Sequence, residues 1–393
     1  MRYILSFTVF TLFILCLVAT FNWLIDPYGN YWSPLVDGLN AKKTQAASYV
    51  RNVTPYRADQ IQPEVLLVGN SRVQLGLAAE SKVLSGSTVY NIALPGAGLA
   101  TSLQHSMYQM QHNPNLKDIV IALDFRYFLA DYSHRSSWND ATLLPSITLS
   151  EISDYERLKI VIRSLISLDS LFSSFLTIFS QDSTVNIITS LGSNTGGWYL
   201  DAIRNEGKVD FYSFQMKKLT GKFERKNLSY KSNEFQNNIN IDRLNLFITL
   251  ANKNHANVKI HLYINPYHYS YWHQIYKTGH WSDYLQWKVD LIKLSLKFDN
   301  INIYDFSIPS IYTLEYLNFE KNKRPMQWYW EPAHYRQALG DVILDAIFNP
   351  ELGCNKQCIL LDNTSEEKIR STTQYGLDST SKQWDIDKII LDL

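Results

Sequence analysis

Short apolar runs that end in polar, glycine or proline residues recur along the chain. Their length and their content of β-branched side chains indicate strands. Their nearly continuous apolar character is typical of strands that are covered on both faces, as in a parallel sheet. The predicted strands comprise residues 65–68, 88–92, 119–123, 258–264 and 301–304.

Apolar positions with a helical period lie between and after these strands. A helix is predicted over 99–111, and Leu285, Val289 and Ile292 fall on one face of another, with the same signature at 339–347. Alternation of strands and helices predicts an α/β fold with right-handed crossovers. We expect a three-layer α/β/α sandwich around a central, mostly parallel five-stranded sheet.

The N-terminal segment differs from the rest, because residues 3–25 carry no charge and are mostly Ile, Leu, Val and Phe. That length spans a bilayer as one helix. Arg2 before it and Asp26 after it predict, by the positive-inside rule, that Met1 is cytoplasmic and the remainder is exported. A cleaved signal peptide would have an apolar region of only ~7–15 residues. We therefore favour a retained single-pass anchor.

The alternation breaks over about 132–235, which we interpret as a largely helical insertion that forms a cap or a partner surface. Its apolar stretch at 158–180 is interrupted by Arg163 and Asp169, and charges at mid-bilayer are costly. We expect a buried or amphipathic helix there, with core packing favoured over a position on the membrane surface. The expected organisation is an anchor (1–25), a juxtamembrane linker (26–60), the α/β domain (61–348) and a loosely attached polar tail (349–393).

Composition narrows the range of functions. The 393 residues include 37 Lys+Arg and 37 Asp+Glu, so no basic excess supports nucleic-acid binding. The hydrophobic share of 46% excludes a disordered chain. Cys354 and Cys358 could form a local disulfide in an exported protein, and the ligands of a metal site are missing near them. No metal or cofactor is expected.

Candidate chemistry follows the first three predicted strands. Ser71, in Gly-Asn-Ser-Arg at 69–72, would lie where α/β sheets bind ligands. This fragment alone favours the alternative, a polar turn in which Ser71 caps the next helix. Gly96 and Gly98 could present bare N–H groups to an anion, and Asn91 could donate its amide or only order the loop. Further candidates for contact with substrate are Arg72, Asp124, Arg126, Tyr267, His268 and Trp330.

Glu331 and His334 lie three residues apart, on a segment that Pro332 keeps out of helical geometry. A carboxylate at that spacing can orient an imidazole, and a neutral imidazole can deprotonate a serine hydroxyl. In the alternative interpretation, His334 merely enters the next helix and Glu331 interacts with the helix dipole. The fragment alone leaves both interpretations open.

Taken in order, the strand followed by Gly-x-Ser, the glycine loop and the acid-x-x-His fragment resemble the SGNH (GDSL-like) hydrolase family over about 60–130 and 255–348. The resemblance implies that Ser71 is a nucleophile, His334 its base and Glu331 the orienting acid. It further implies an oxyanion hole whose donors come from Ser71, Gly96 or Gly98, and Asn91. Asn70 and Glu331 replace the aspartates usual in the family, and its Gly-x-Asn-Asp block is missing.

Asp-Pro-Tyr-Gly at 26–29, Asn-x-x-x-Pro-Gly at 91–96 and His-Tyr-Arg at 334–336 resemble a membrane-anchored bacterial branch of that family. The branch is similar to proteins that handle O-acyl groups on envelope polysaccharides, such as alginate acetylation and teichoic-acid D-alanylation factors. It implies a serine esterase or O-acyltransferase acting on cell-envelope glycans from the periplasmic side of the inner membrane. A multi-spanning membrane acyltransferase is a candidate partner.

The alternative is a catalytically inactive SGNH-like subunit that binds a polysaccharide or a membrane partner. The missing asparagine block favours that alternative. The presence of both Ser71 and His334 favours catalysis. We expect the enzyme.

Overall fold

The structure is a computed structural model of the 393-residue chain. Residues 132–153 of the expected insertion lie outside the described residues. The structure describes residues 1–131, 154–182, 187–225, 228–231, 238–298, 301–319, 322–349, 351, 353–354, 356–361 and 364–393.

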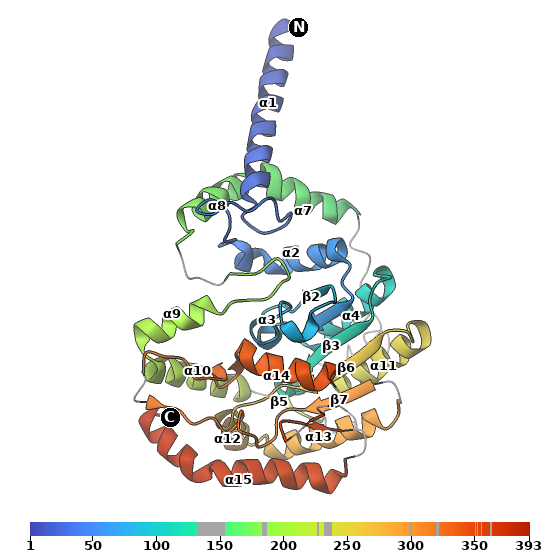
Figure 1. Ribbon diagram of the computed structural model, residues 1–393, viewed down its shortest axis with the longest axis vertical. Coiled ribbons are helices and arrows are strands. Elements are labelled where there is room, and N and C mark those ends of the chain that lie inside the picture. The colour runs from blue at the N-terminus through green and yellow to red at the C-terminus, as the bar shows by residue number, and fades with distance from the viewer. Residues whose placement is uncertain are drawn as a thin grey trace.

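A mixed, mostly parallel sheet of six strands forms the centre of the protein (Figure 1), with the spatial order β10-β7-β6-β3-β1-β2. All neighbouring strands pair in parallel except β10, which pairs antiparallel with β7. The predicted strands are thus confirmed, but the sheet has one strand more than expected. The strands are β1 (Val65–Val68), β2 (Val89–Asn91), β3 (Asp118–Leu123), β6 (Lys259–Ile264), β7 (Ile301–Asp305) and β10 (Ile359–Leu360).

Helices cover both faces of this sheet. The helices α4 (Leu99–His112), α11 (Ile239–Asn254) and α13 (Trp281–Ser295) pack side by side. The helices α3 (Ser71–Gly76) and α14 (Gln337–Phe348) pack against one another. Right-handed crossovers place these two groups on opposite faces, which explains why all four residues of β1 are buried.

The order of the parallel strands fixes where a ligand would bind. Numbered along the chain, they lie in the order 2-1-3-4-5, so the connections change direction between β1 and β3. Ligands of open α/β sheets bind beyond the carboxyl ends of the strands at such a switch point. Ser71 follows β1 and Asp124 follows β3, so the fold brings both residues to this point.

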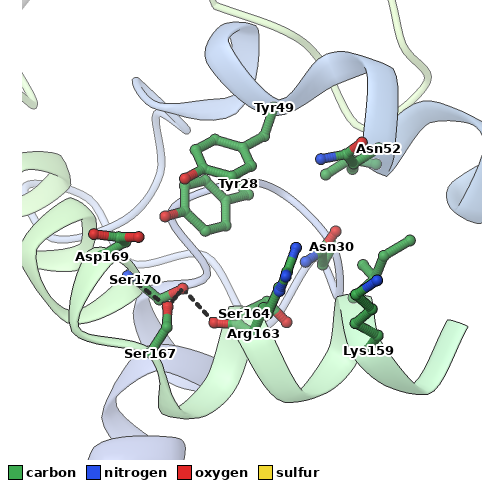
Figure 2. A pocket seen from close by; sticks show the side chains of 12 residues that line it. Tyr28, Asn30, Tyr49, Asn52, Lys159, Arg163, Ser164, Ser167, Asp169 and Ser170 are labelled. Carbon is green, nitrogen blue, oxygen red and sulfur yellow. Dashed lines mark hydrogen bonds between the residues drawn. The ribbon is translucent and has the colours of Figure 1, made fainter. Parts of the chain in front are cut away.

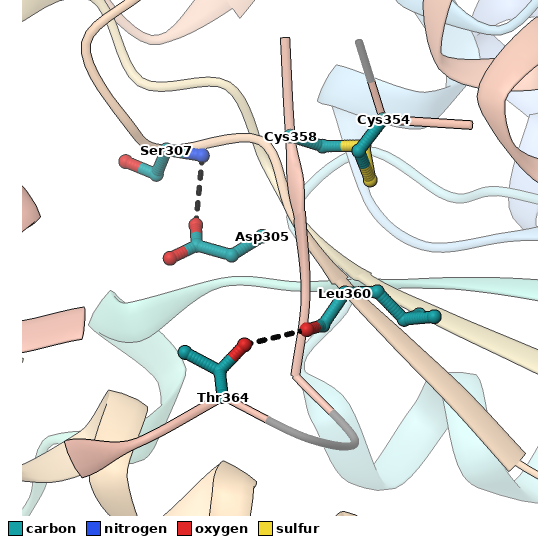
Figure 3. The surroundings of a disulfide bond; sticks show 6 residues. All are labelled: Asp305, Ser307, Cys354, Cys358, Leu360 and Thr364. Atoms are coloured by element: carbon teal, nitrogen blue, oxygen red, sulfur yellow. Dashed lines mark hydrogen bonds between the residues drawn. A yellow bond between two sulfur atoms is a disulfide. The ribbon is translucent and has the colours of Figure 1, made fainter. Parts of the chain in front are cut away.

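The C-terminal segment is an integral part of the fold, and the expectation of a loose tail is wrong. The disulfide between Cys354 and Cys358 precedes β10, which extends the sheet beyond β7 (Figure 3). The helix α15 (Glu366–Ile390) then packs against α13 and α12 (Tyr269–Lys277).

The N-terminal helix α1 (Arg2–Ile25) projects from the body of the protein (Figure 1). Among the described residues, it is the one single helix that is long and apolar enough to span a membrane, and a signal sequence has the same properties. The expected linker contains α2 (Ala46–Ile61).

The remaining elements belong mostly to the insertion and to short connections. They are η1 (Lys82–Leu84), α5 (Phe125–Phe128), β4 (Ala130–Asp131), α7 (Asp154–Ile166), α8 (Leu168–Phe179), α9 (Gly197–Glu206), α10 (Lys208–Phe223), β5 (Leu228–Ser229), β8 (Tyr329–Glu331) and β9 (His334–Tyr335). The helices α7 and α8 lie across the base of α1 and are bent by 59° relative to one another (Figure 1).

Candidate active site

A tight turn after β1 presents Ser71 at the carboxyl end of the sheet. A Cβ atom at Gly69 would collide with Val73, so only glycine fits between the strand and the helix. The side-chain oxygen of Asn70 accepts a hydrogen bond from the N–H of Arg72 at 2.9 Å, which caps α3. Asn70 is therefore the helix cap, and Ser71 keeps a partly exposed hydroxyl.

A short hairpin carries the other two candidate residues. Glu331 ends β8 and His334 begins β9, and the two residues pair across the turn. The ring of Tyr335 packs where a Cβ atom of Gly76 would lie, so β9 approaches α3 closely. The Tyr335 hydroxyl also lies 2.8 Å from that of Tyr263 on β6. The glycine therefore allows the hairpin to bring His334 toward Ser71.

Ser71, His334 and Glu331 form a continuous hydrogen-bonded chain. Ser71 Oγ lies 2.7 Å from His334 Nε2, and the Nδ1 atom of His334 makes a short hydrogen bond to Glu331 Oε1. The second oxygen of Glu331 accepts the N–H of Ala333 at 2.9 Å. If Nδ1–H donates to the carboxylate, the Nε2 lone pair is free to accept the serine proton. This is the arrangement that deprotonates a hydroxyl nucleophile.

The electrostatic surroundings favour a neutral imidazole. Burial lowers the pKa of His334, Glu331 offsets part of that effect, and Arg72 and Lys222 lower the pKa further, so that it lies below its ordinary value. Burial would raise the pKa of Glu331, but His334, the N–H of Ala333 and Arg72 together hold it below its ordinary value. At neutral pH the site therefore contains a carboxylate and a base that can take up a proton.

Arg72 connects the turn at residues 69–72 to the hairpin. Its guanidinium forms an ion pair with Asp124 and donates from Nε to the carbonyl of Ala333 at 2.6 Å. The same group lies 5.6 Å from the ring centroid of Tyr267 and 5.4 Å from that of Tyr271. The hydroxyl of Tyr267 donates to Asp124 at 3.0 Å.

These internal contacts correct the expectation that Arg72, Asp124 and Tyr267 touch the substrate. All three side chains are buried, and their polar atoms are used to hold β1, β3 and the hairpin together. They are positioning residues. The contact between Arg72 and Ala333 is central, since Ala333 lies between the two hairpin members of the triad.

The oxyanion donors expected from the sequence are only partly available. The amide of Asn91 donates to the carbonyls of Val73 and Leu77 and accepts the N–H of Ala93, and the residue is fully buried. The expectation that Asn91 donates to a substrate is therefore wrong. Gly98 lines a small hollow of about 10 Å³ together with Asn70, whereas Gly96 does not.

Backbone groups are the remaining candidates for an oxyanion hole. Within the described part of the chain, the N–H groups of Ser71, Gly96 and Gly98 have no hydrogen-bond acceptor. Ser71 adjoins Asn70, which shares the small hollow with Gly98. The N–H groups of Ser71 and Gly98 are thus better placed than that of Gly96 to face a developing oxyanion.

The other three residues expected to contact substrate have different environments. His268 is fully buried and hydrogen-bonded to the carbonyl of Glu315 at 2.6 Å, and burial lowers its pKa to about 4. The expectation that His268 contacts substrate is wrong. Arg126 is half-buried and donates to the carbonyl of Lys222 at 3.0 Å. Trp330, on β8 of the hairpin, is buried in a small apolar cluster with residues of α9 and α10.

Two residues of the insertion lie at the site, and sequence reasoning missed both. The ring of Tyr199, from α9, is 5.6 Å from that of His334 and 5.8 Å from that of Trp330. Lys222, from α10, lowers the pKa of His334. No motif marks either residue. The nearest sequence signal for this contact is the glycine at position 196. It has a positive φ, and a Cβ atom there would collide with the Trp330 ring.

Comparisons with known proteins add no identification. No protein-family model matches the chain, and no curated protein matches it significantly. Within the described residues, no three His, Cys, Asp or Glu side chains lie close enough together to hold a metal ion. The function must therefore be argued from the site itself.

Proposed function

We propose that the protein is a serine-dependent esterase or O-acyltransferase that acts on acyl esters of cell-envelope glycans. The observation that carries the proposal is the 2.7 Å contact between Ser71 Oγ and His334 Nε2, with His334 held by Glu331. The resemblance to the SGNH hydrolases supplies the reaction class, and the apolar helix α1 is consistent with a place at the cell envelope.

The proposed reaction has two halves. Ser71 Oγ attacks the ester carbonyl while His334 Nε2 takes the serine proton, and the N–H groups of Ser71 and Gly98 stabilise the oxyanion. The tetrahedral intermediate expels the alcohol, which receives the proton from His334, and an acyl-serine remains. In the second half, water or a sugar hydroxyl attacks that acyl group, His334 accepts its proton, and Ser71 regains it on leaving.

The acceptor in the second half decides between hydrolysis and transfer. An exported site has no access to cytosolic acyl-CoA, and one spanning helix cannot carry a substrate across a membrane. Transfer would therefore require a membrane partner that delivers the acyl group, for which a multi-spanning acyltransferase is the candidate.

One observation favours the alternative, an inactive SGNH-like subunit that binds a polysaccharide or a membrane partner. The side-chain amides of Asn70 and Asn91 are both engaged in internal hydrogen bonds. The oxyanion hole would then consist of backbone groups alone, and loss of one donor in such a site typically costs about 10²–10³ in rate.

Labelling of the full chain with a serine-directed fluorophosphonate, together with hydrolysis of an aryl acetate, tests the proposal. We expect wild type to be labelled at Ser71 and to hydrolyse the ester, and Ser71→Ala to lose both. Ser365→Ala is the matched control, because Ser365 also stands at the start of a helix but is exposed on α15. It should behave like wild type.

Two results would count against the enzyme. Folded wild-type protein that is neither labelled nor active supports the inactive subunit, and retained glycan binding would then strengthen that alternative. Labelling and hydrolysis that persist in Ser71→Ala would show that another residue is the nucleophile.

A further inference from the structure

The helix α8 presents its apolar side to the exterior and its polar side to the protein. Leu168, Phe172, Phe175 and Phe179 share one face by their spacing of 4, 3 and 4 residues. Leu168 and Phe179 are 82% and 83% exposed, and Phe172 is 65% exposed. A helix on the surface of a water-soluble domain has the opposite orientation.

The inward face of α8 consists of hydroxyl side chains. Ser170, Ser173, Ser174 and Thr177 are all buried. Ser173 Oγ accepts a hydrogen bond from the Tyr28 hydroxyl at 3.0 Å. These bonds attach the polar face to the body of the protein, so the outward direction of the phenylalanines is built into the packing.

The helix α7 continues the same pattern. Leu158, Ile162 and Ile166 recur every four residues and are exposed. Ser164 is buried, and Lys159 and Arg163 line a cavity of about 420 Å³ on the side of α7 that faces α2 (Figure 2). The two helices together therefore form a continuous structure with polar groups inward and large apolar groups outward. We call α7 and α8 the collar.

Contacts with α1 fix the level of the collar along that helix. The Asn22 side chain donates to the carbonyl of Leu165 at 2.8 Å and accepts the hydroxyl of Ser174 at 2.8 Å. The rings of Phe21 and Phe175 lie 5.2 Å apart. About 20 helical residues cross the hydrocarbon core of a bilayer. Counted from Arg2, the core ends near Asn22, which is the level of the collar.

We infer that the collar lies in the boundary of the lipid bilayer from which α1 emerges, with Leu168, Phe172 and Phe179 among the acyl chains. A lipid surface covers the exposed apolar face of the collar, because this face is continuous with a helix of membrane-spanning length. The face also lies at the level where that helix leaves the membrane. Amphipathic helices that lie in this boundary bury their apolar face ~5–10 Å deep. Trp23, 44% exposed at the same level, suits an interfacial position.

The exposure of the apolar face contradicts the expectation of core packing for residues 158–180, and the inference takes up the alternative of a position on the membrane surface. It is independent of the catalytic proposal, because it uses none of the residues around Ser71. It also has a structural consequence, since a helix that spans the membrane and two helices that lie on it together fix the orientation of the whole body relative to the membrane plane.

Quenching by lipids in nanodiscs tests the inference with the full chain. Phe172→Cys and Phe179→Cys, each in a Cys16→Ala background, carry an environment-sensitive fluorophore, and the lipids carry bromine at a shallow or a deep acyl position. The native Cys16 on α1 is free and serves as the deep control. Ile389→Cys, 78% exposed on α15, serves as the aqueous control.

We expect the probes at 172 and 179 to emit at shorter wavelength than the probe at 389 and to be quenched most by shallow bromines. The probe at Cys16 should be quenched most by deep bromines. Water-like emission at both collar positions would refute the inference. Shielded emission without lipid quenching would also refute it, because protein, either this chain, a second copy or a partner, would then cover the collar.

Discussion

Loss of the Asp124 charge should destabilise the protein strongly, because it leaves a buried guanidinium without its counter-ion. Asp124 is 3% and Arg72 8% exposed, and the two form an ion pair at the switch point of the sheet. Removal of one partner of such a pair costs about 3–5 kcal/mol. In Asp124→Asn, the new amide nitrogen would also face the donor of Asn70, which now donates to Asp124 at 3.0 Å. We therefore expect Asp124→Asn to lower the free energy of unfolding by about 3–5 kcal/mol.

A double-mutant cycle separates the ion pair from general packing. Arg72→Met keeps an unbranched apolar chain beside the rings of Tyr267 and Tyr271, which stack on one another at 4.2 Å, but removes the charge. The variant Arg72→Met/Asp124→Asn should be more stable than the sum of the single losses predicts. Groups in direct contact show coupling energies of about 0.5–3 kcal/mol.

Urea unfolding of the full chain, followed by tryptophan fluorescence, measures these losses as shifts of the midpoint at constant slope. Glu64→Gln is the control, because Glu64 pairs with Lys117 on the surface, at 2.5 Å. Exposed pairs contribute little, so its midpoint should scarcely move. If Asp124→Asn costs no more than Glu64→Gln, or if the single losses are simply additive, the ion pair does not hold the turn at residues 69–72 in place.

Three further predictions concern the pH dependence of labelling, the close approach of the hairpin to α3, and the C-terminal disulfide. The rate of fluorophosphonate labelling should rise with pH as His334 loses its proton, with a midpoint below 6.5, the ordinary imidazole value. Since Glu331 raises the pKa of His334, Glu331→Gln should move that midpoint lower and reduce the rate by up to about 10⁴-fold. Gly76→Ala should cost about 1–3 kcal/mol and slow labelling, whereas Gly221→Ala, which meets nothing within 4 Å, should be neutral or stabilising in the same urea assay. Cys354→Ser should lower stability by about 2 kcal/mol or less, because the disulfide closes a very short loop.

The positions of the core strands could be predicted because the pattern of their side chains alone indicates where each strand lies. Each parallel strand is covered on both faces, so its apolar run is nearly continuous, and polar residues mark its carboxyl end. Ser71 and Asp124 follow two such runs, which places them at one edge of the sheet. The hydrogen bond between Ser71 and His334 spans 263 residues. The order of the fragments could suggest this contact, but local periodicity carries no information about it.

The C-terminal helix was not predictable by the same means. On its buried face, Ile369, Leu377 and Trp384 are separated by Thr373 and Thr380, which are buried and polar. Apolar positions therefore recur only every seven or eight residues, which is too sparse for an amphipathic signal. The strand β10 is also only two residues long, so it carries no alternation of its own.

The direction of an amphipathic face was also beyond the sequence. The spacing of Phe172, Phe175 and Phe179 predicts one apolar stripe, but a stripe does not say whether protein or lipid covers it. The deciding facts are tertiary, namely the bond from Ser174 to Asn22 and the bond from Tyr28 to Ser173. The sequence favours core packing, whereas the structure presents the serines to the protein.

One described segment of the insertion, residues 187–196, is firmly bonded to the body of the protein close to the candidate active site. These residues attach to β2, since the carbonyl of Leu191 accepts the N–H of Asn91 at 2.8 Å. Ser193 Oγ accepts the N–H of Ala79 at 2.8 Å, and Asn194 donates to the carbonyl of Gln74 at 2.8 Å. The helix α9 follows directly and places Tyr199 on His334.

Two of these contacts are backbone bonds to β2 and α3, and the third joins the Ser193 side chain to the N–H of Ala79. Because bonds to Asn22 and Tyr28 attach the collar to the same body, the fold sets the height of the site above the collar. If the collar lies in the bilayer boundary and Ser71 is the nucleophile, acyl esters must then reach the protein at that fixed height. A glycan still attached to a membrane lipid, or an acyl group delivered by a membrane partner, meets this condition, whereas a freely diffusing ester gains nothing from it. The rate of hydrolysis of a soluble aryl acetate should therefore be unaffected by charge substitutions on the collar such as Phe172→Glu, while turnover of a membrane-bound substrate should fall.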